Sequence, residues 1–131
     1  MSIHDLGLLD TSVVIAPPPD LADLAAHVAI SAVTVGELSF GLHTSDPIKS
    51  AEREHRYRTV LAAYDPIPYS VEVAHWYGAI AAAVKTGGRN PRSRTADLMI
   101  AATARHARAA LLTRNPGDFK GLEHILTVVP V

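Results

Sequence analysis

Short apolar runs alternate with longer helical stretches along this chain of 131 residues, and this alternation constrains the fold more than any other feature. Leu6–Leu9 and Ala110–Thr113 are runs of four residues with the length and composition of buried strands. Strands that alternate with helices form mostly parallel sheets, because each parallel connection crosses over the sheet. We therefore predict an α/β fold of three layers, with a central, mostly parallel sheet of about four to five strands flanked by α-helices.

Helix caps, prolines and glycines predict where the elements begin and end. Strands are expected at Leu6–Leu9, Val28–Ile30, Pro66–Tyr69, Ala110–Thr113 and Ile125–Val129. Helices are expected at Thr11–Ala16, at Asp20–Ala26, from the cap Ser31 to about Leu42, from Asp46 and Pro47 to about Tyr64, from the cap Ser70 to about Lys85, and at Thr95–Ala107. The stretches Thr86–Pro91 and Asn115–Gly121 have the composition of loops.

The composition suits one packed domain spanning residues 1–131, since apolar residues make up 48% of the chain and charged residues 19%. The absence of cysteine excludes disulfides, thiolate zinc sites and cysteine nucleophiles, and fits a reducing compartment. No apolar run approaches the roughly 18 residues of a membrane span, and the first ten residues do not resemble a signal peptide. We expect a soluble, cytoplasmic protein without a membrane partner.

Two aspartates follow predicted strands. Asp10 comes directly after Leu9, and Asp118 lies in the loop after Thr113. Ligands of a parallel sheet bind beyond the carboxyl ends of its strands, so both side chains are expected at the functional edge. Simpler roles are also open, because aspartate is a favoured helix cap and a common turn residue.

Two further acids are expected on helices that flank the same edge. Glu37 shares its predicted helix face with Val33 and Phe40, so we expect it among apolar neighbours. Asp97 shares its row with Ile100 and alanines, although a first-turn aspartate also stabilises a helix through the helix dipole. A buried ionised carboxylate is unfavourable unless it is paired or bound to a cation.

Four converging acids repel one another unless a cation lies between them. Mg²⁺ or Mn²⁺ suits carboxylate and water oxygens. Such an ion lowers the pKa of a bound water and neutralises charge that develops on a phosphoryl oxygen. The residues therefore point to hydrolysis of phosphodiesters.

Four motifs resemble, in order, those of PIN-domain ribonucleases, most closely the VapC-type toxins of bacterial type II toxin–antitoxin pairs. The motifs are Leu8-Leu9-Asp10-Thr11-Ser12, Val35-Gly36-Glu37-Leu38, Ala96-Asp97-Leu98-Met99-Ile100-Ala101-Ala102, and Leu112-Thr113-Arg114-Asn115-Pro116-Gly117-Asp118-Phe119. The resemblance spans nearly the whole chain. It implies a PIN-like fold and a metal-dependent endoribonuclease whose products carry a 3′-hydroxyl and a 5′-phosphate.

The resemblance also implies roles for individual residues. Asp10, Glu37, Asp97 and Asp118 would form the acidic quartet that binds Mg²⁺ or Mn²⁺, with Asp10 and Asp97 as direct ligands. Glu37 and Asp118 would bind a second ion, hold metal-bound waters or orient the attacking water. The supporting polar positions are Thr11, Ser12, Thr113 and Asn115.

Family members commonly form homodimers and bind a cognate antitoxin in a hetero-oligomer, so both partners are expected beside the RNA substrate. The stretch between Asp10 and Glu37 is shorter than usual for these toxins and contains Pro17, Pro18 and Pro19. That region often helps to bind the partner, so the shortening bears on the antitoxin groove rather than on the acids.

Basic residues cluster before and after Asp97, where they are expected to contact RNA phosphates. They are Arg89, Arg92, Arg94 and Arg114, of which Arg94 and Arg114 are the strongest candidates. The seven histidines lack zinc-site spacing. Trp76 and Tyr77 fall within a helix, which favours a core or dimer contact over base stacking.

Two other functions compete with a ribonuclease. Asp10 at a strand end suits an aspartyl nucleophile of a phosphoaspartate protein, either a phosphatase or a receiver-like domain. Against this, Ser12 stands where a phosphatase would carry its second acid, and the last strands lack a receiver's lysine. A non-catalytic binding module is disfavoured by the intact quartet.

The net charge of -1 conceals two opposed regions. Residues 1–84 carry four basic and ten acidic residues, whereas residues 85–120 carry eight basic and two acidic ones. The two acids in the basic region are Asp97 and Asp118. Such asymmetry indicates a charged partner and is compatible with RNA.

Overall fold

A four-stranded parallel sheet forms the centre of the computed structural model, which describes residues 3–131. Its strands are β1 (His4–Leu9), β2 (Ala25–Ala29), β3 (Ala110–Thr113) and β4 (Val128–Pro130). They lie in the order β2-β1-β3-β4, and all three pairings are parallel. The predicted parallel α/β architecture is confirmed, and β1 and β3 occupy its interior.

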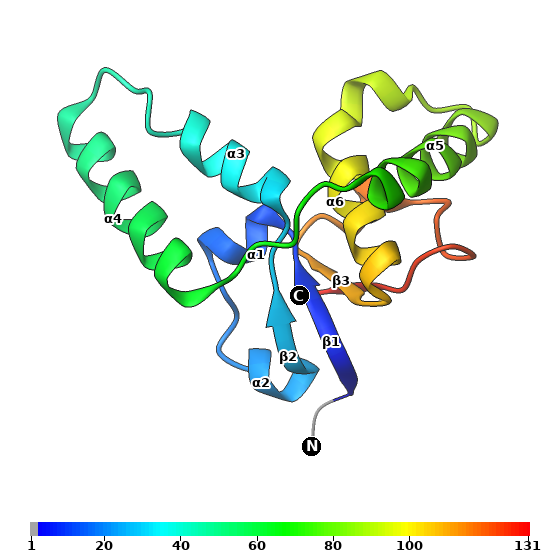
Figure 1. The fold of residues 1–131 in the computed structure, drawn as a ribbon, viewed down its shortest axis with the longest axis horizontal. Coiled ribbons are helices and arrows are strands. Elements are labelled where there is room, and N and C mark those ends of the chain that lie inside the picture. Colours follow the sequence, from blue (N-terminus) through cyan, green and yellow to red (C-terminus); the bar gives the residue numbers. More distant parts are fainter. Residues whose placement is uncertain (1–2) are drawn as a thin grey trace.

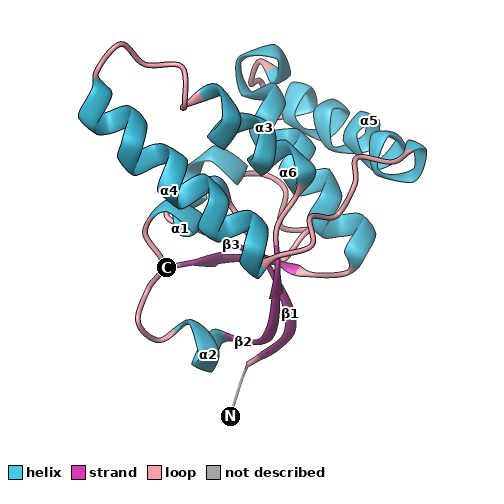
Figure 2. Cartoon of the chain, turned by 60° about the vertical axis from the view of Figure 1, so that its left-hand side comes forward, coloured by secondary structure: helices cyan, strands magenta, loops and turns pink. Residues whose placement is uncertain are grey.

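The connections between the strands are helical. The α-helices are α1 (Thr11–Ile15), α2 (Leu21–Leu24), α3 (Ala32–Phe40), α4 (Pro47–Ala63), α5 (Val71–Thr86) and α6 (Thr95–Ala107). Two short 3-10 helices, η1 (Pro91–Arg94) and η2 (Pro116–Phe119), flank α6 and β3 in the chain. Figure 1 shows α3 and α4 on one side of the sheet and α5 and α6 on the other, and Figure 2 shows the strands beneath the helices.

The predicted caps begin their helices through side-chain hydrogen bonds. The hydroxyl of Ser31 accepts from the backbone N–H of Val33 at 3.0 Å. Asp46 accepts from the backbone of Ile48 at 2.9 Å, directly before the proline that opens α4. Each bond satisfies a backbone N–H that has no partner within its own helix. Serine and aspartate are therefore favoured at these positions, and their presence in the sequence predicts where the helix begins.

Alternating side chains of the inner strands build two cores, one on each face of the sheet. Leu8 and Leu111 pack with the residues of α5 and α6. Leu9 and Leu112 point the other way and pack with α1, α3 and α4. Because both faces are buried, the central stretches Leu6–Leu9 of β1 and Ala110–Leu112 of β3 carry no polar side chain, as expected for a parallel sheet between two helical layers.

Three predicted elements differ in the structure. Helix α2 ends at Leu24, and β2 already begins at Ala25, whose backbone is extended and whose pairing with β1 overrides the helical preference of alanine. Pro66–Tyr69 forms no strand, because its prolines lack the N–H of a ladder and Ile67 alone forms a bridge, to Ser31. The last strand begins at Val128 rather than Ile125, since a turn folds Leu126 back onto Leu122.

Among residues 3–131, no helix is both long and apolar enough to cross a membrane.

Gly7 on β1 is required by close packing. A Cβ added there would lie 2.9 Å from Leu112 Cδ1 and 3.0 Å from the Cβ of Ala25. Leu112 is fully buried and has no room to move. We predict that Gly7→Ala lowers the unfolding free energy by about 1–3 kcal/mol in urea denaturation.

Gly78→Ala is the matched control, since a Cβ at this exposed position on α5 meets no atom within 4 Å. It is expected to raise the stability by up to about 1 kcal/mol, because alanine favours the helix. Equal stability of the two variants would contradict the packing argument.

Candidate functional site

The carboxyl ends of β1 and β3 meet at one edge of the sheet. Leu9 pairs with Leu112, and the backbone N–H of Asp10 donates to the carbonyl of Leu112 at 2.9 Å. Asp10 therefore leaves β1 directly beside Thr113, the last residue of β3. This is the edge at which the sequence predicts a site.

Asp10 is 5% exposed and held by three donors. Its Oδ1 accepts from the backbone N–H of Thr11 at 2.8 Å. Its Oδ2 accepts from the hydroxyls of Ser12 at 3.1 Å and Thr113 at 2.7 Å. The carboxylate is thus both the cap of α1 and a fixed part of the edge, so its two expected roles coincide.

Glu37 reaches the same edge from α3. The hydroxyl of Thr11 donates to Glu37 Oε1 at 2.6 Å and lies 3.0 Å from the hydroxyl of buried Thr34. The expectation of an apolar environment for Glu37 is wrong, because Thr34 and Leu38 face the core while Glu37 is exposed. Phe40, assigned to the same face, is 81% exposed.

Asp97 is the electrostatic centre of the cluster. Partial burial, followed by the charges of Asp10, Asp118 and Glu37, raises its pKa from 3.8 to about 6, while Arg94 acts in the opposite sense. Within residues 3–131, no side chain or backbone N–H donates a hydrogen bond to this carboxylate. The structure therefore brings all four predicted acids within electrostatic reach, and leaves the carboxylates of Asp97 and Asp118 without a hydrogen-bond donor within residues 3–131.

Asp118 lies on η2, which is tied to the N-terminal end of α6. Arg94 Nη1 donates to the main-chain carbonyl of Asp118 at 2.8 Å and lies 3.7 Å from its carboxylate Oδ1. Arg89 Nη1 donates to the carbonyl of neighbouring Gly117 at 2.9 Å. These two arginines position the turn that carries Asp118.

The predicted RNA contacts are largely engaged with the protein itself. Arg114 Nε donates to the carbonyl of Ala16 at 2.9 Å, and its Nη2 bonds the same atom, which ties the end of β3 to the end of α1. Arg92 is exposed, and its side chain has no hydrogen bond within the part of the chain described. Contact between these arginines and RNA stays a prediction.

The roles of Thr34, Arg89 and Arg94 as positioning residues were not foreseen. A signal was present for Thr34, which precedes Glu37 by three residues and so lies on a neighbouring part of the helix surface. Asn115, by contrast, contributes only backbone atoms: its N–H donates to Thr113 Oγ1 at 3.0 Å, and its carbonyl accepts from the N–H of Asp118 at 3.0 Å.

The donor set suits a hard divalent cation. The four acids and their neighbouring hydroxyls present only oxygen, and the Asp97 carboxylate lacks a hydrogen-bond donor. No three acidic or histidine side chains among residues 3–131 form a ready-made metal cage. Mg²⁺ does not need one, because it keeps several waters and usually takes one or two carboxylates directly.

Comparison with known proteins agrees with this geometry. The family model described as PIN domain matches residues 7–124. The chain belongs to the PIN-domain family. Ribonuclease VapC8 of Mycobacterium tuberculosis is 39% identical over 103 residues, which cover 76% of this chain and 90% of that protein. The resemblance to VapC-type PIN domains is thereby confirmed.

Solved structures extend the likeness to the fold. VapBC-5 from Mycobacterium tuberculosis, a member of the VapBC family of toxin-antitoxin systems, has a TM-score of 0.81 and 28% identity, covering 96% of this chain and 97% of that one. FitAcB from Neisseria gonorrhoeae has a TM-score of 0.75 and 29% identity, covering 95% and 97%. The expected PIN-like architecture is confirmed.

The phosphoaspartate alternative loses its basis in this PIN domain. The family match and the acidic neighbours of Asp97 favour metal chemistry instead.

Asp97→Asn is predicted to stabilise the metal-free protein at neutral pH. In the unfolded chain Asp97 titrates at its ordinary pKa of 3.8, and in the folded chain near 6. Between these values the unfolded state loses a proton that the folded state retains, so stability falls as the pH rises from about 4 to about 6. Above that window the variant should gain about 1 kcal/mol after allowance for solvent screening, or about 4 °C in melting temperature.

Thermal melts in EDTA across this pH range measure the effect. At pH 4 both proteins should melt alike, and added Mg²⁺ should raise the melting temperature of the wild type more than that of the variant. A wild type that equals Asp97→Asn at neutral pH would contradict the repulsion inferred for the cluster.

Thr113→Val is predicted to lower the unfolding free energy by about 1–3 kcal/mol, because it keeps the shape of the side chain and deprives buried Asp10 of a donor. Thr59→Val on exposed α4 removes a hydroxyl that bonds only the carbonyl of His55 and should change stability by less than about 0.5 kcal/mol. Urea denaturation compares the two, and a loss at Thr59 as large as that at Thr113 would contradict the proposed role.

Proposed function

We propose that this VapC-type protein is the toxin of a toxin–antitoxin pair and an endoribonuclease that hydrolyses RNA phosphodiester bonds with Mg²⁺ or Mn²⁺. The observation that carries the proposal is the position of Asp97, a partly buried carboxylate without a hydrogen-bond donor, whose pKa is raised first by burial and then by the charges of Asp10, Asp118 and Glu37. Such an arrangement is unfavourable in an empty protein and becomes favourable once a divalent cation shares the site.

Asp10 and Asp97 are the residues that we assign as direct metal ligands. Asp10 is oriented by Ser12 and Thr113, so it presents its remaining lone pairs in a fixed direction. Asp97 is free to turn toward the ion because no donor restrains it. The bound metal would supply an activated water and stabilise negative charge on the phosphoryl oxygens.

Glu37 and Asp118 are assigned to the outer part of the site. Thr11 holds one oxygen of Glu37, which leaves the other to hold a metal-bound water, orient the attacking water or bind a second ion. Asp118 sits on the turn that Arg94 and Arg89 tie down, so its position depends on the main chain. The products expected from this chemistry carry a 3′-hydroxyl and a 5′-phosphate.

The second partner that we propose is a cognate antitoxin. VapBC-5 is described as a member of a toxin-antitoxin family, and by analogy the antitoxin of this chain would cover the acidic edge or insert a basic side chain among the carboxylates. We also propose a homodimer and a toxin–antitoxin hetero-oligomer, both acting in the cytoplasm. Growth arrest on expression, relieved by the product of a small adjacent gene, would support the toxin role.

The ribonuclease proposal predicts metal-dependent cleavage by the purified, antitoxin-free protein. Labelled RNA should be cut with Mg²⁺ or Mn²⁺ and remain intact with EDTA. Asp97→Asn should reduce the cleavage rate by at least about a hundredfold, because it removes a charged metal ligand, while circular dichroism remains that of the wild type.

The matched control is Asp65→Asn, at an exposed loop position distant in sequence from all four acids. It is expected to cleave RNA at the wild-type rate. Undiminished cleavage by Asp97→Asn would refute the site assignment, and incorporation of phosphate from acetyl phosphate at Asp10 would favour the phosphoaspartate alternative.

A further inference from the structure

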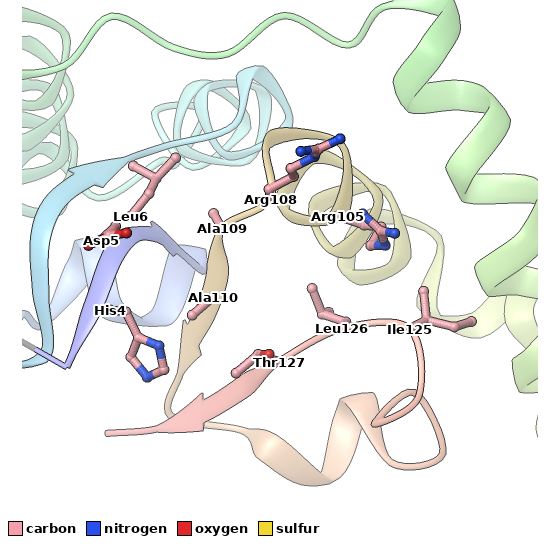
Figure 3. Close-up of a pocket in the computed structure, with 10 residues that line it drawn as sticks. All are labelled: His4, Asp5, Leu6, Arg105, Arg108, Ala109, Ala110, Ile125, Leu126 and Thr127. Carbon is pink, nitrogen blue, oxygen red and sulfur yellow. The ribbon is translucent and has the colours of Figure 1, made fainter.

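A hollow of about 320 Å³ opens at the amino-terminal edge of the sheet, opposite the carboxylates. It is bordered by the start of β1, the start of β3, the C-terminal end of α6 and the segment that leads into β4 (Figure 3). The proposed catalytic acids do not line it. Two arginines line it: Arg105 in the last turn of α6, and Arg108 directly after the end of that helix.

The guanidinium groups of the two arginines of this hollow have no hydrogen bond or ion pair of their own among the described residues. Other arginines of the chain donate to main-chain carbonyls, namely Arg53, Arg89, Arg94 and Arg114. Arg105 lies over the ring of Trp76 at 4.1 Å, which fixes its position and leaves N–H donors available.

The backbone of Arg108 is a second and independent observation. Its φ of 55° places it in the left-handed region, where no other non-glycine residue of the described chain lies. Helices that end in this conformation favour glycine or asparagine, so backbone preference does not select an arginine. The helix dipole does not require it either, because Arg105 and His106 already place basic side chains in the last turn. The side chain itself is the remaining reason for the residue.

The rest of the lining suits an anion. His4 and Thr127 add groups that can donate hydrogen bonds. Asp5 is the one acid that lines the hollow, and it forms no ion pair with either arginine. In Figure 3 Asp5 lies on the opposite side of the hollow from the two guanidinium groups.

We propose that this hollow is a phosphate-binding exosite for single-stranded RNA, an inference that rests on the ribonuclease function proposed above. Helix α6 fixes its distance from the acids, since Asp97 lies near one end and Arg105 and Arg108 near the other. At 1.5 Å per residue, Arg105 lies about 12 Å from Asp97 along the helix, and Arg108 follows directly after its end. Because the helix is buried between them, an RNA held at both places passes around it over a path longer than this axial distance.

An RNA backbone explains the arginines better than a protein segment does. Guanidinium groups bind phosphate oxygens through paired N–H donors. Residues 85–120, which include all of α6, carry eight basic and two acidic residues, so the exosite lies within the basic part of the chain. The proposed substrate already places a phosphate at the other end of this helix, and one strand reaches both.

Arg108→Asn gives a clean test, because asparagine tolerates the left-handed conformation and removes the charge. Binding of fluorescent RNA is followed by anisotropy in EDTA, so that no cleavage occurs. For a strand of about 16 nucleotides we expect affinity to fall roughly threefold in Arg108→Asn and about tenfold in Arg105→Gln/Arg108→Asn, with the salt slope reduced by about 0.7 for each lost phosphate contact. A strand of about four nucleotides, which offers fewer phosphates, should bind the wild type more weakly and rank the variants in the same order.

Arg58→Gln is the control, since Arg58 is exposed on α4 and paired with Glu54. It should bind both strands as the wild type does. Unchanged binding of the long strand by the folded Arg108→Asn and double variants would overturn the proposal. The proposal would also be overturned if the arginine variants lost binding to an acidic protein partner while their RNA binding stayed unchanged, because the hollow would then be a protein-binding site.

The experiments distinguish a failure of the exosite proposal from a failure of the ribonuclease proposal. If the wild type binds the long RNA through Arg108 but does not cleave it with Mg²⁺ or Mn²⁺, the proposed ribonuclease function is refuted and the RNA-binding proposal is supported. A wild type that cleaves RNA, with kcat/KM on the long strand unchanged in both arginine variants, would refute the exosite alone.

Discussion

The parallel pairing of β1 with β3 is the constraint on which the site depends. It places Asp10 next to Thr113 at the carboxyl edge, although the two are more than a hundred positions apart in the chain. A buried carboxylate at this edge is tolerated because hydroxyl and backbone donors surround it. Those donors also fix its orientation, so the interactions that stabilise Asp10 also hold it in the position that the proposed metal site requires.

The arginines near the acids act mainly through the main chain. Arg94, Arg89 and Arg114 bond carbonyls of the loops that surround the edge. A tight ion pair with a carboxylate would block the oxygen that a metal needs, whereas a bond to a carbonyl positions the loop and leaves that oxygen free. Arg94 lies 3.7 Å from the Asp118 carboxylate and still lowers the pKa of Asp97, so it offsets part of the repulsion without closing the site.

Features that depend on local interactions can be predicted from the sequence, whereas features that depend on contacts between distant segments cannot. Ser31, Asp46 and Ser70 cap their helices as predicted, because capping involves residues only two or three positions apart. The start of β2 at Ala25 depends on its pairing with β1, which no local pattern records. The placing of Asp10 and Asp118 after strands was predictable since strand ends of a parallel sheet converge, whereas Glu37 and Asp97 lie on helices and joined the predicted quartet through the PIN-domain motifs. The exposure of Glu37 and the carbonyl contacts of the arginines depend on how the helices and loops pack, which the pattern of residues along one element does not contain.

Helix α6 shows how a nearly neutral chain can keep an acidic cluster and a basic surface apart. Its first turn carries Asp97, and its end carries Arg105 and Arg108. Asp97 and Arg105 lie about 12 Å apart along the helix, which is more than the Debye length of about 8 Å at physiological salt. Each end of the helix therefore keeps its own local potential. The acidic end can hold a cation while the basic end attracts phosphate, which the total charge of -1 conceals.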